Sequence, residues 1–196
     1  MFTGIISHRG SFTAYRRDKK ELVLEAPELA SRLSVGDSVS VDGVCLSVIR
    51  KDSRSLSFNL SRETLSLTTL GSLRPGEKVN LELPLTPTSL LGGHLISGHI
   101  DYRAKLLRAV PRPPGKRFVF SLPPEFRPYF VPKGSVAVSG VSLTVAAVGP
   151  ASFEVELIPI TLAESNLAAL KTGAQVNVEC DMIGKYVYNF KVTGNP

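Results

Sequence analysis

The chain has 196 residues, 43% of them hydrophobic and 20% charged, which is enough to bury a core and is typical of a globular protein. The basic residues behind the net charge of +6 are scattered and not interleaved with aromatics, which argues against nucleic-acid binding. Two cysteines without CxxC spacing argue against a zinc site and a disulfide-stapled fold, and no apolar run could span a membrane. The first residues carry no signal-peptide pattern, so we expect a cytoplasmic protein.

The first half of the chain predicts a mostly β structure. Short alternating segments are separated by turns such as Gly36-Asp37 and Asp42-Gly43. The expected strands are residues 2–7, 10–16, 21–26, 38–41, 44–51, 55–60 and 78–83, and short helices are expected at 27–33 and 63–67. Many short strands at this spacing indicate a closed barrel or a sandwich.

The second half begins after a linker at residues 84–89, which contains two prolines. Residues 92–101 contain His94 and His99 and predict a strand, and short helices are expected at 124–130 and 161–170. Residues 182–190 predict a short helix with apolar residues on one side. An extra apolar segment after a finished domain is typical of a contact with another subunit.

The two halves are copies of one another. Residues 39–48 match 136–145, and at the same spacing residues 76–82 match 173–179. The first residues repeat as well, since Phe2-Thr3-Gly4-Ile5-Ile6 aligns with Ile96-Ser97-Gly98-His99-Ile100. The chain is therefore predicted to contain two copies of one small β domain and, with them, two related pockets.

Polar positions at which the copies agree are candidates for ligand contacts. The matched hydroxyl pairs are Ser38 with Ser135, Ser47 with Thr144, and Thr64 with Thr161. These hydroxyls either bind a planar polar ligand or bond to their own backbone.

Positions at which the copies differ are candidates for the chemistry. Cys45 aligns with Ser142, and His99 aligns with Ile5. Cys45 is either a small buried apolar residue or a nucleophile, and His99 is a residue that titrates near neutral pH. Asp181 either belongs to a site or caps the last helix. His94, nearer the turn, has the weaker claim to a role.

The combined motifs resemble the riboflavin synthase alpha-chain family over nearly the whole chain. They are Met1-Phe2-Thr3-Gly4-Ile5, Asp42-Gly43-Val44-Cys45-Leu46-Ser47-Val48, Ser139-Gly140-Val141-Ser142-Leu143-Thr144-Val145, Gly92-Gly93-His94-Leu95-Ile96-Ser97-Gly98-His99 and Val176-Asn177-Val178-Glu179-Cys180-Asp181.

The resemblance implies an all-β chain of two tandem six-stranded Greek-key barrels with short helices and a C-terminal helix. The domains would be 1–87 and 88–181, each binding a lumazine, followed by an oligomerisation tail at 182–196. The implied reaction converts two molecules of 6,7-dimethyl-8-ribityllumazine into riboflavin and 5-amino-6-ribitylamino-pyrimidinedione by transfer of a four-carbon unit, without a cofactor or metal. A homotrimer is implied, in which one substrate sits on the first barrel and the other on the second barrel of a neighbouring chain. Lumazine synthase is a candidate partner.

The resemblance also implies roles for residues. His99, Cys45 and Ser38 match positions important for the reaction, with His99 as the candidate base and a water, Ser38 or Cys45 as the candidate nucleophile. The implied substrate contacts are Phe2, Thr3, Gly4, Ser47, Thr64, Ser142, Thr144, Ile158, Ile160 and Asp181. Ser47 stands where the family usually has Thr, and the tail is shorter than in many members. The alternative function is that of a non-catalytic relative that binds lumazine or flavin.

Overall fold

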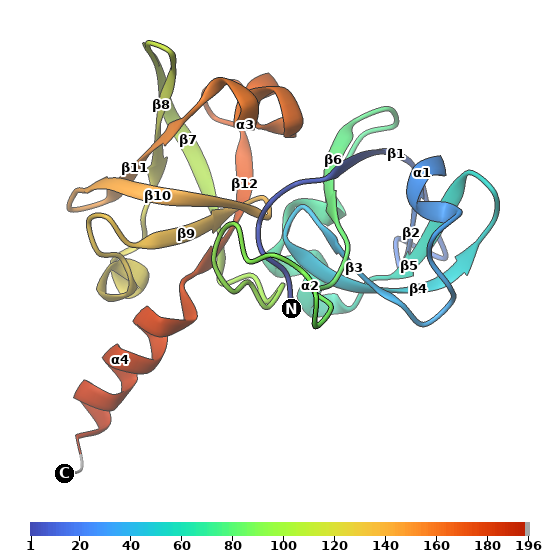
Figure 1. Ribbon diagram of the computed structural model, residues 1–196, viewed down its shortest axis with the longest axis horizontal. Helices are drawn as coiled ribbons and strands as arrows, with labels where there is room; N and C mark the ends of the chain where they lie inside the picture. Colours follow the sequence, from blue (N-terminus) through green and yellow to red (C-terminus); the bar gives the residue numbers. More distant parts are fainter. Residues whose placement is uncertain (195–196) are drawn as a thin grey trace.

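A computed structural model describes residues 1–194 and contains two closed antiparallel barrels that lie side by side (Figure 1). A C-terminal helix leaves the second barrel and projects away from both (Figure 1). Of the tail predicted at 182–196, residues 195 and 196 lie outside the described residues.

The first barrel has six strands, and each is short and alternates between buried and exposed residues or is buried throughout. They are β1 (His8–Arg16), β2 (Glu21–Glu25), β3 (Ser38–Val41), β4 (Val44–Lys51), β5 (Ser55–Asn59) and β6 (Lys78–Glu82). They close in the order β1-β2-β5-β4-β3-β6.

The second barrel repeats this topology. Its strands are β7 (Tyr102–Arg112), β8 (Gly115–Ser121), β9 (Ser135–Val138), β10 (Val141–Val148), β11 (Ser152–Leu157) and β12 (Gln175–Cys180). When β7 is aligned with β1, the closed order is the same as in the first barrel. In each, three consecutive antiparallel strands are followed by a fourth that returns beside the first of them, which is the Greek-key arrangement. The predicted fold of two six-stranded barrels is confirmed.

Short helices join the strands. They are α1 (Pro27–Ala30), α2 (Arg62–Leu67), η1 (Thr69–Gly71), η2 (Pro124–Tyr129), α3 (Pro159–Glu164), η3 (Asn166–Ala169) and α4 (Met182–Thr193). Proline occupies the first turn of α1 and α3, and the Ser61 hydroxyl caps α2 by accepting from the Thr64 N–H. The helix expected at 161–170 is divided into α3 and η3, and the one expected at 27–33 ends at Ala30.

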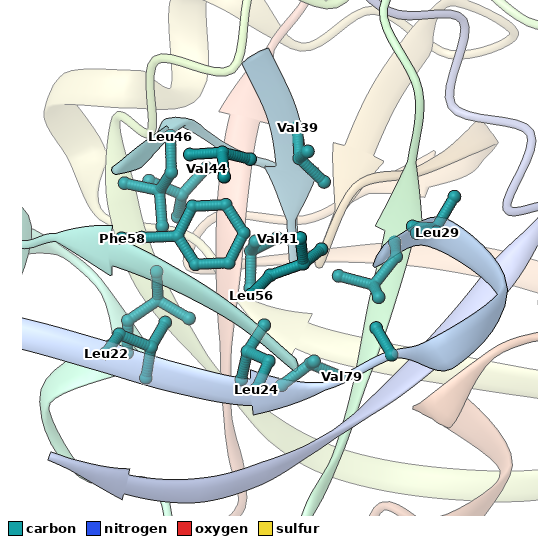
Figure 2. Packing of buried hydrophobic residues seen from close by; sticks show 14 of the residues in the cluster. Leu22, Leu24, Leu29, Val39, Val41, Val44, Leu46, Leu56, Phe58 and Val79 are labelled. Carbon is teal, nitrogen blue, oxygen red and sulfur yellow. The ribbon is translucent and has the colours of Figure 1, made fainter. Parts of the chain in front are cut away.

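Each barrel is filled by its own apolar core. In the first, Phe58 lies at the centre of leucine and valine side chains from all around the barrel (Figure 2). The second is filled in the same way around Phe118, Phe120 and Phe153. Because every second residue of a strand points inward, these cores use one face of each strand. The other face is buried as well in β3, β6, β9 and β12.

The strands predicted at residues 2–7 and 92–101 are wrong. The structure has only an isolated antiparallel bridge between Phe2 and Ile96 in these two segments. Main-chain N–H groups of these segments donate to buried carboxylates, and their Gly4 and Gly98 carbonyls accept from the neighbouring barrel, so no ladder continues between the two segments. These two segments, instead of forming strands, contribute to the candidate site described below.

Candidate functional site

Two short segments cross between the barrels. We call residues 2–6 the first crossing segment and residues 96–100 the second crossing segment. They pair at the bridge, where the Phe2 N–H donates to Ile96 O at 2.8 Å and the Ile96 N–H donates to Phe2 O at 3.0 Å. Phe2 and Ile96 are buried in a small cluster of their own between the barrels, against Ala137 and Cys45.

Each crossing segment is held by a buried glutamate at the end of its own barrel's last strand. Glu82 accepts from the N–H groups of Thr3 (2.7 Å) and Gly4 (2.9 Å) and from the Thr3 hydroxyl. Glu179 accepts in the same way from Ser97 (2.7 Å) and Gly98 (2.9 Å) and from the Ser97 hydroxyl. Burial raises the pKa of Glu82, while these donors lower it. Charge-assisted bonds of this kind fix both segments in matching positions.

The segments then exchange barrels. The Gly4 carbonyl accepts from the Ser142 N–H on β10, and the Gly98 carbonyl accepts from the Cys45 N–H on β4, both at 2.9 Å. Ile6 packs against the second core and Ile100 against the first. Each barrel is therefore completed by a segment anchored on the other one.

This exchange forms a pocket on each barrel. The first pocket, of about 220 Å³, is lined by Val44, Cys45, Glu63, Thr64, Leu67, Thr68, Gly98, His99 and Ile100. The second pocket, of about 480 Å³, is lined by Gly4, Ile5, Ile6, Ser7, Val141, Ser142, Ile158, Ile160, Thr161, Glu164 and Ser165. Both are bounded by the fourth strand of the barrel, the helix that follows its fifth strand, and the crossing segment from the other barrel.

The two pockets share a frame but differ in chemistry. Cys45 and His99 lie in the first, and Ser142 and Ile5 stand at the equivalent places in the second. The first pocket thus offers a thiol and an imidazole, and the second a hydroxyl and an apolar wall. Two similar cavities with different reactive groups suit two similar ligands that undergo different steps.

Comparisons with known proteins give the origin of this arrangement. The family model described as the lumazine binding domain matches residues 3–84 and again 97–181. Riboflavin synthase of Mycobacterium tuberculosis is 37% identical, covering 95% of this chain and 96% of that protein. Riboflavin synthase of Bacillus amyloliquefaciens is 36% identical, covering 97% of this chain and 89% of that protein. This chain belongs to the riboflavin synthase family. The fold is also that of LumP complexed with riboflavin, with a TM-score of 0.83 at 22% identity over 92% of this chain and 99% of that one.

Seven of the predicted site residues line the pockets and are candidates for direct contact with a ligand. Cys45, Thr64 and His99 come together in the first, and Ser142 lines the second. Ile158 and Ile160 also line the second pocket, and their side chains are 56% and 64% exposed, so they form an open apolar rim.

Other predicted residues lie beside the pockets. Ser38 pairs with Ser47 across β3 and β4, on the outer face that also carries Cys45, but both serines are outside the lining. Thr144 holds the place of Ser47 on β10. Since same-face residues of a strand are about 7 Å apart, these hydroxyls extend the outer face of each barrel next to its pocket.

Two of the three contacts predicted in the first crossing segment lie away from the pocket wall that this segment forms. Phe2 is fully buried in the cluster between the barrels, and the Thr3 side chain is bound to Glu82. Of these three predicted contacts, only Gly4 reaches the lining of the second pocket, together with Ile5 and Ile6 of the same segment. Asp181 caps α4 by accepting from the Ile183 N–H at 3.0 Å, and it lies in a separate groove between η2 and α4.

Sequence reasoning missed the anchoring glutamates and a side-chain contact made by one histidine. Glu82 and Glu179 stand at matched positions of the two copies, and that repetition of a carboxylate was a usable signal. The His94 Nδ1 lies 2.7 Å from the Ser142 hydroxyl oxygen, although the sequence favoured His99 over it.

Two further observations concern metals and membranes. Residues 1–194 contain no group of three or more His, Cys, Asp or Glu side chains arranged to hold a metal ion. None of the helices in that range is both long and apolar enough to cross a bilayer. The cytoplasmic location stays a prediction.

Proposed function

We propose that this chain is a riboflavin synthase that converts two molecules of 6,7-dimethyl-8-ribityllumazine into riboflavin and 5-amino-6-ribitylamino-pyrimidinedione. The observation that carries the proposal is the pair of pockets, which are built from equivalent elements of the two barrels but contain different reactive side chains. Two copies of one substrate are expected to bind to two pockets built from the same elements, and these pockets are, although their volumes are about 220 and 480 Å³. The two pockets also need different groups, because one molecule gives up a four-carbon unit and the other accepts it.

The chemistry asks for a base, a nucleophile and stabilisation of an anion. The methyl group on carbon 7 of one lumazine must lose a proton, and His99 in the first pocket is the candidate base. The charge that remains is delocalised into the ring, where main-chain N–H groups and hydroxyls stabilise it. A water, Ser38 or Cys45 is the candidate nucleophile at carbon 7 of the other ring. Holding two rings face to face contributes through proximity.

We propose substrate contacts for each of the two pockets. Thr64 contacts the ligand in the first pocket, and Ser142, Ile158 and Ile160 contact it in the second. Ser47 and Thr144 extend these contacts along the outer faces of the barrels, and Asp181 extends them towards α4. Phe2, Thr3 and Gly4 contribute by holding the first crossing segment in place.

We propose further that the chain forms a homotrimer through α4. Ile183, Tyr186, Val187 and Phe190 recur at helical spacing, and their side chains are 64–76% exposed. The opposite face of α4 is occupied, because Tyr188 packs edge-on against Tyr129 of η2 with ring centroids 5.4 Å apart. Both pockets are open at the surface, so a neighbouring copy could close them. In that assembly a first pocket would face a second pocket of another chain.

Replacement of an apolar residue on the exposed face of α4 tests this assembly. Phe190→Glu is expected to yield monomers by light scattering and to lower turnover more than about 10-fold, because association needs this face desolvated. Asn189→Glu, which adds the same charge at the adjacent exposed position, is the control and is expected to keep the trimer. A monomeric wild-type chain that is fully active would contradict the proposal.

Incubation of the chain with 6,7-dimethyl-8-ribityllumazine tests the activity, and riboflavin absorbance is the readout. Cys45→Ser is expected to lower turnover about 10-fold or more while leaving lumazine binding nearly unchanged, because serine keeps the size but not the nucleophilicity. Unchanged turnover would remove Cys45 from the mechanism. If the wild-type chain binds lumazine but makes no riboflavin, the alternative of a non-catalytic binding protein is correct.

Two further parts of the proposal concern organisation. We place the boundaries of the domains at 87/88 and 181/182, which fall in the segment between β6 and β7 and at the start of α4. Lumazine synthase is a candidate protein partner, to be tested by co-sedimentation of the two purified proteins.

A further inference from the structure

A third cavity lies between the two barrels and shares no lining residue with either pocket. We call it the inter-barrel groove. Its volume is about 620 Å³, which is within the range of cavities that take a small organic molecule. Its polar lining comes from both barrels and includes Asp42, Thr69, Arg74, Glu77, Ser139 and Asn166.

Two buried polar side chains of this groove have hydrogen-bonding capacity left over. Asp42 and Ser139 stand at equivalent turns of the two barrels, and each is only 4% exposed. Asp42 Oδ1 accepts from the Asn80 N–H and from Asn166 Nδ2, whereas within residues 1–194 Asp42 Oδ2 accepts from no group. The Ser139 hydroxyl also has no partner in that range, although the Ser139 carbonyl accepts from Asn80 Nδ2.

Both of these oxygen atoms can be reached from the groove. Neither is enclosed by protein atoms, unlike the unpartnered Glu21 Oε2 of the first barrel. Buried polar groups are nearly always hydrogen-bonded, because leaving them unpaired costs free energy. A carboxylate oxygen and a hydroxyl left free in one groove therefore indicate a place where a polar ligand binds.

The charges around the groove indicate which ligand fits. Glu77 adds a second carboxylate, and its repulsion contributes to the raised pKa of Asp42. Within the part of the chain that the structure describes, the ion pairs involve neither Asp42 nor Glu77. Arg74 also lines the groove, but only its main-chain N–H contacts Glu77, and its side chain is exposed. A cation held between the two carboxylates would replace repulsion by attraction.

We propose that the inter-barrel groove binds a small organic cation through a primary ammonium group. An ammonium has three N–H donors, and Asp42 Oδ2, the Glu77 carboxylate and the Ser139 hydroxyl are three acceptors on the same groove. Because residues 1–194 bring no three His, Cys, Asp or Glu side chains together, this donor set suits an ammonium better than a metal ion. The ligand links the two barrels at a place that the proposed reaction does not use.

Equilibrium dialysis of the full chain against labelled putrescine tests the proposal. At pH 8 Asp42, with a pKa of about 7, is ionised, and the amine is protonated. We expect one saturable site with a Kd below about 1 mM at constant ionic strength. Unlabelled 1,4-butanediol, which has the same length without the charges, should not displace the putrescine. Lack of saturable binding at putrescine concentrations up to about 10 mM, or displacement by the diol, would overturn the proposal.

Two variants locate the bound cation. Asp42→Asn keeps an oxygen for both of its donors but removes the charge, and we expect it to raise the Kd for putrescine more than about 10-fold. Asp18→Asn removes an exposed carboxylate of the same barrel, and we expect it to change the Kd less than about twofold. If Asp42→Asn binds putrescine as tightly as the wild type, the cation binds elsewhere. If both variants weaken binding equally, only the net charge of the protein attracts it, and in either case the inference is wrong.

Discussion

Gly98→Ala is expected to lower the rate of riboflavin formation about 100-fold and to lower the free energy of unfolding by several kcal/mol. A Cβ atom at this position would lie 2.4 Å from the Cys45 Cβ and 2.7 Å from the Cys45 main-chain nitrogen. Backbone atoms of β4 cannot move aside as a flexible side chain can. The second crossing segment must therefore lift off β4, and this breaks the bond from the Cys45 N–H to the Gly98 carbonyl.

Three contributions give the expected decrease in the free energy of unfolding. The φ of +85° at Gly98 disfavours any residue with a side chain, by about 1 kcal/mol. Overpacking adds about 1–3 kcal/mol, and loss of a buried hydrogen bond adds about 1 kcal/mol. Since His99 directly follows Gly98, the candidate base moves as well, and a displacement of about 1 Å can lower the rate about 100-fold.

Gly76→Ala is the matched control, because Gly76 has the same φ of +85° but no atom within 4 Å of the added Cβ. We expect it to cost only the backbone strain of about 1 kcal/mol and to leave turnover intact. Thermal unfolding and the riboflavin assay measure both variants. Equal effects of the two substitutions would show that the close approach to Cys45 has no role.

The barrel fold could be predicted because the same pattern of strands and turns occurs in both halves of the chain. Alternation within β4 marks one buried face, and the in-register match of residues 39–48 with 136–145 makes the same prediction a second time. Turns with small polar residues and glycine mark where the strands end. A family resemblance then supplied the strand order, which local patterns do not specify.

The crossing of the two segments could not be predicted in the same way. Residues 2–6 and 96–100 have the pattern of a strand, but a pattern does not say which barrel a segment serves. The competing partners were the carboxylates of Glu82 and Glu179, which satisfy N–H groups that a ladder would otherwise use. The contact of His94 with Ser142 could not be predicted either, because it spans 48 residues and exists only once the barrels meet.

The contact between the barrels also contains a carboxylate, Asp42, that has no counterpart in the second barrel. Replacing it with a neutral side chain is expected to stabilise the protein. Asp42 and Ser139 occupy equivalent turns that meet at Gly43 and Gly140, and both residues are buried. The Oδ1 atom of Asp42 accepts from the Asn80 N–H at 2.8 Å and from the Asn166 Nδ2 of the other barrel at 2.9 Å. Burial nevertheless raises the pKa of Asp42 from 3.8 to about 7, because the two donors offset only part of the desolvation cost and Glu77 adds repulsion.

Asp42→Asn is therefore expected to raise the free energy of unfolding at pH 8 by about 2–4 kcal/mol. Asparagine keeps an oxygen for both donors and tolerates the φ of +45° at this position. A raised pKa means that the folded state binds the proton more tightly than the unfolded state. The wild-type chain therefore loses stability as the pH rises from about 4 to about 7, and the variant does not.

The measurement is chemical unfolding of both proteins between pH 4 and pH 8. The gap between variant and wild type should be smallest near pH 4, widen up to pH 7 and then stay constant, because above pH 7 Asp42 is ionised in both states of the wild type. Asp18→Asn, which removes an exposed carboxylate from the same barrel, is the control for net charge. A gap that does not change with pH would mean that the buried carboxylate is fully compensated by Asn80 and Asn166, and the contact between the barrels would then have no preference for the protonated form.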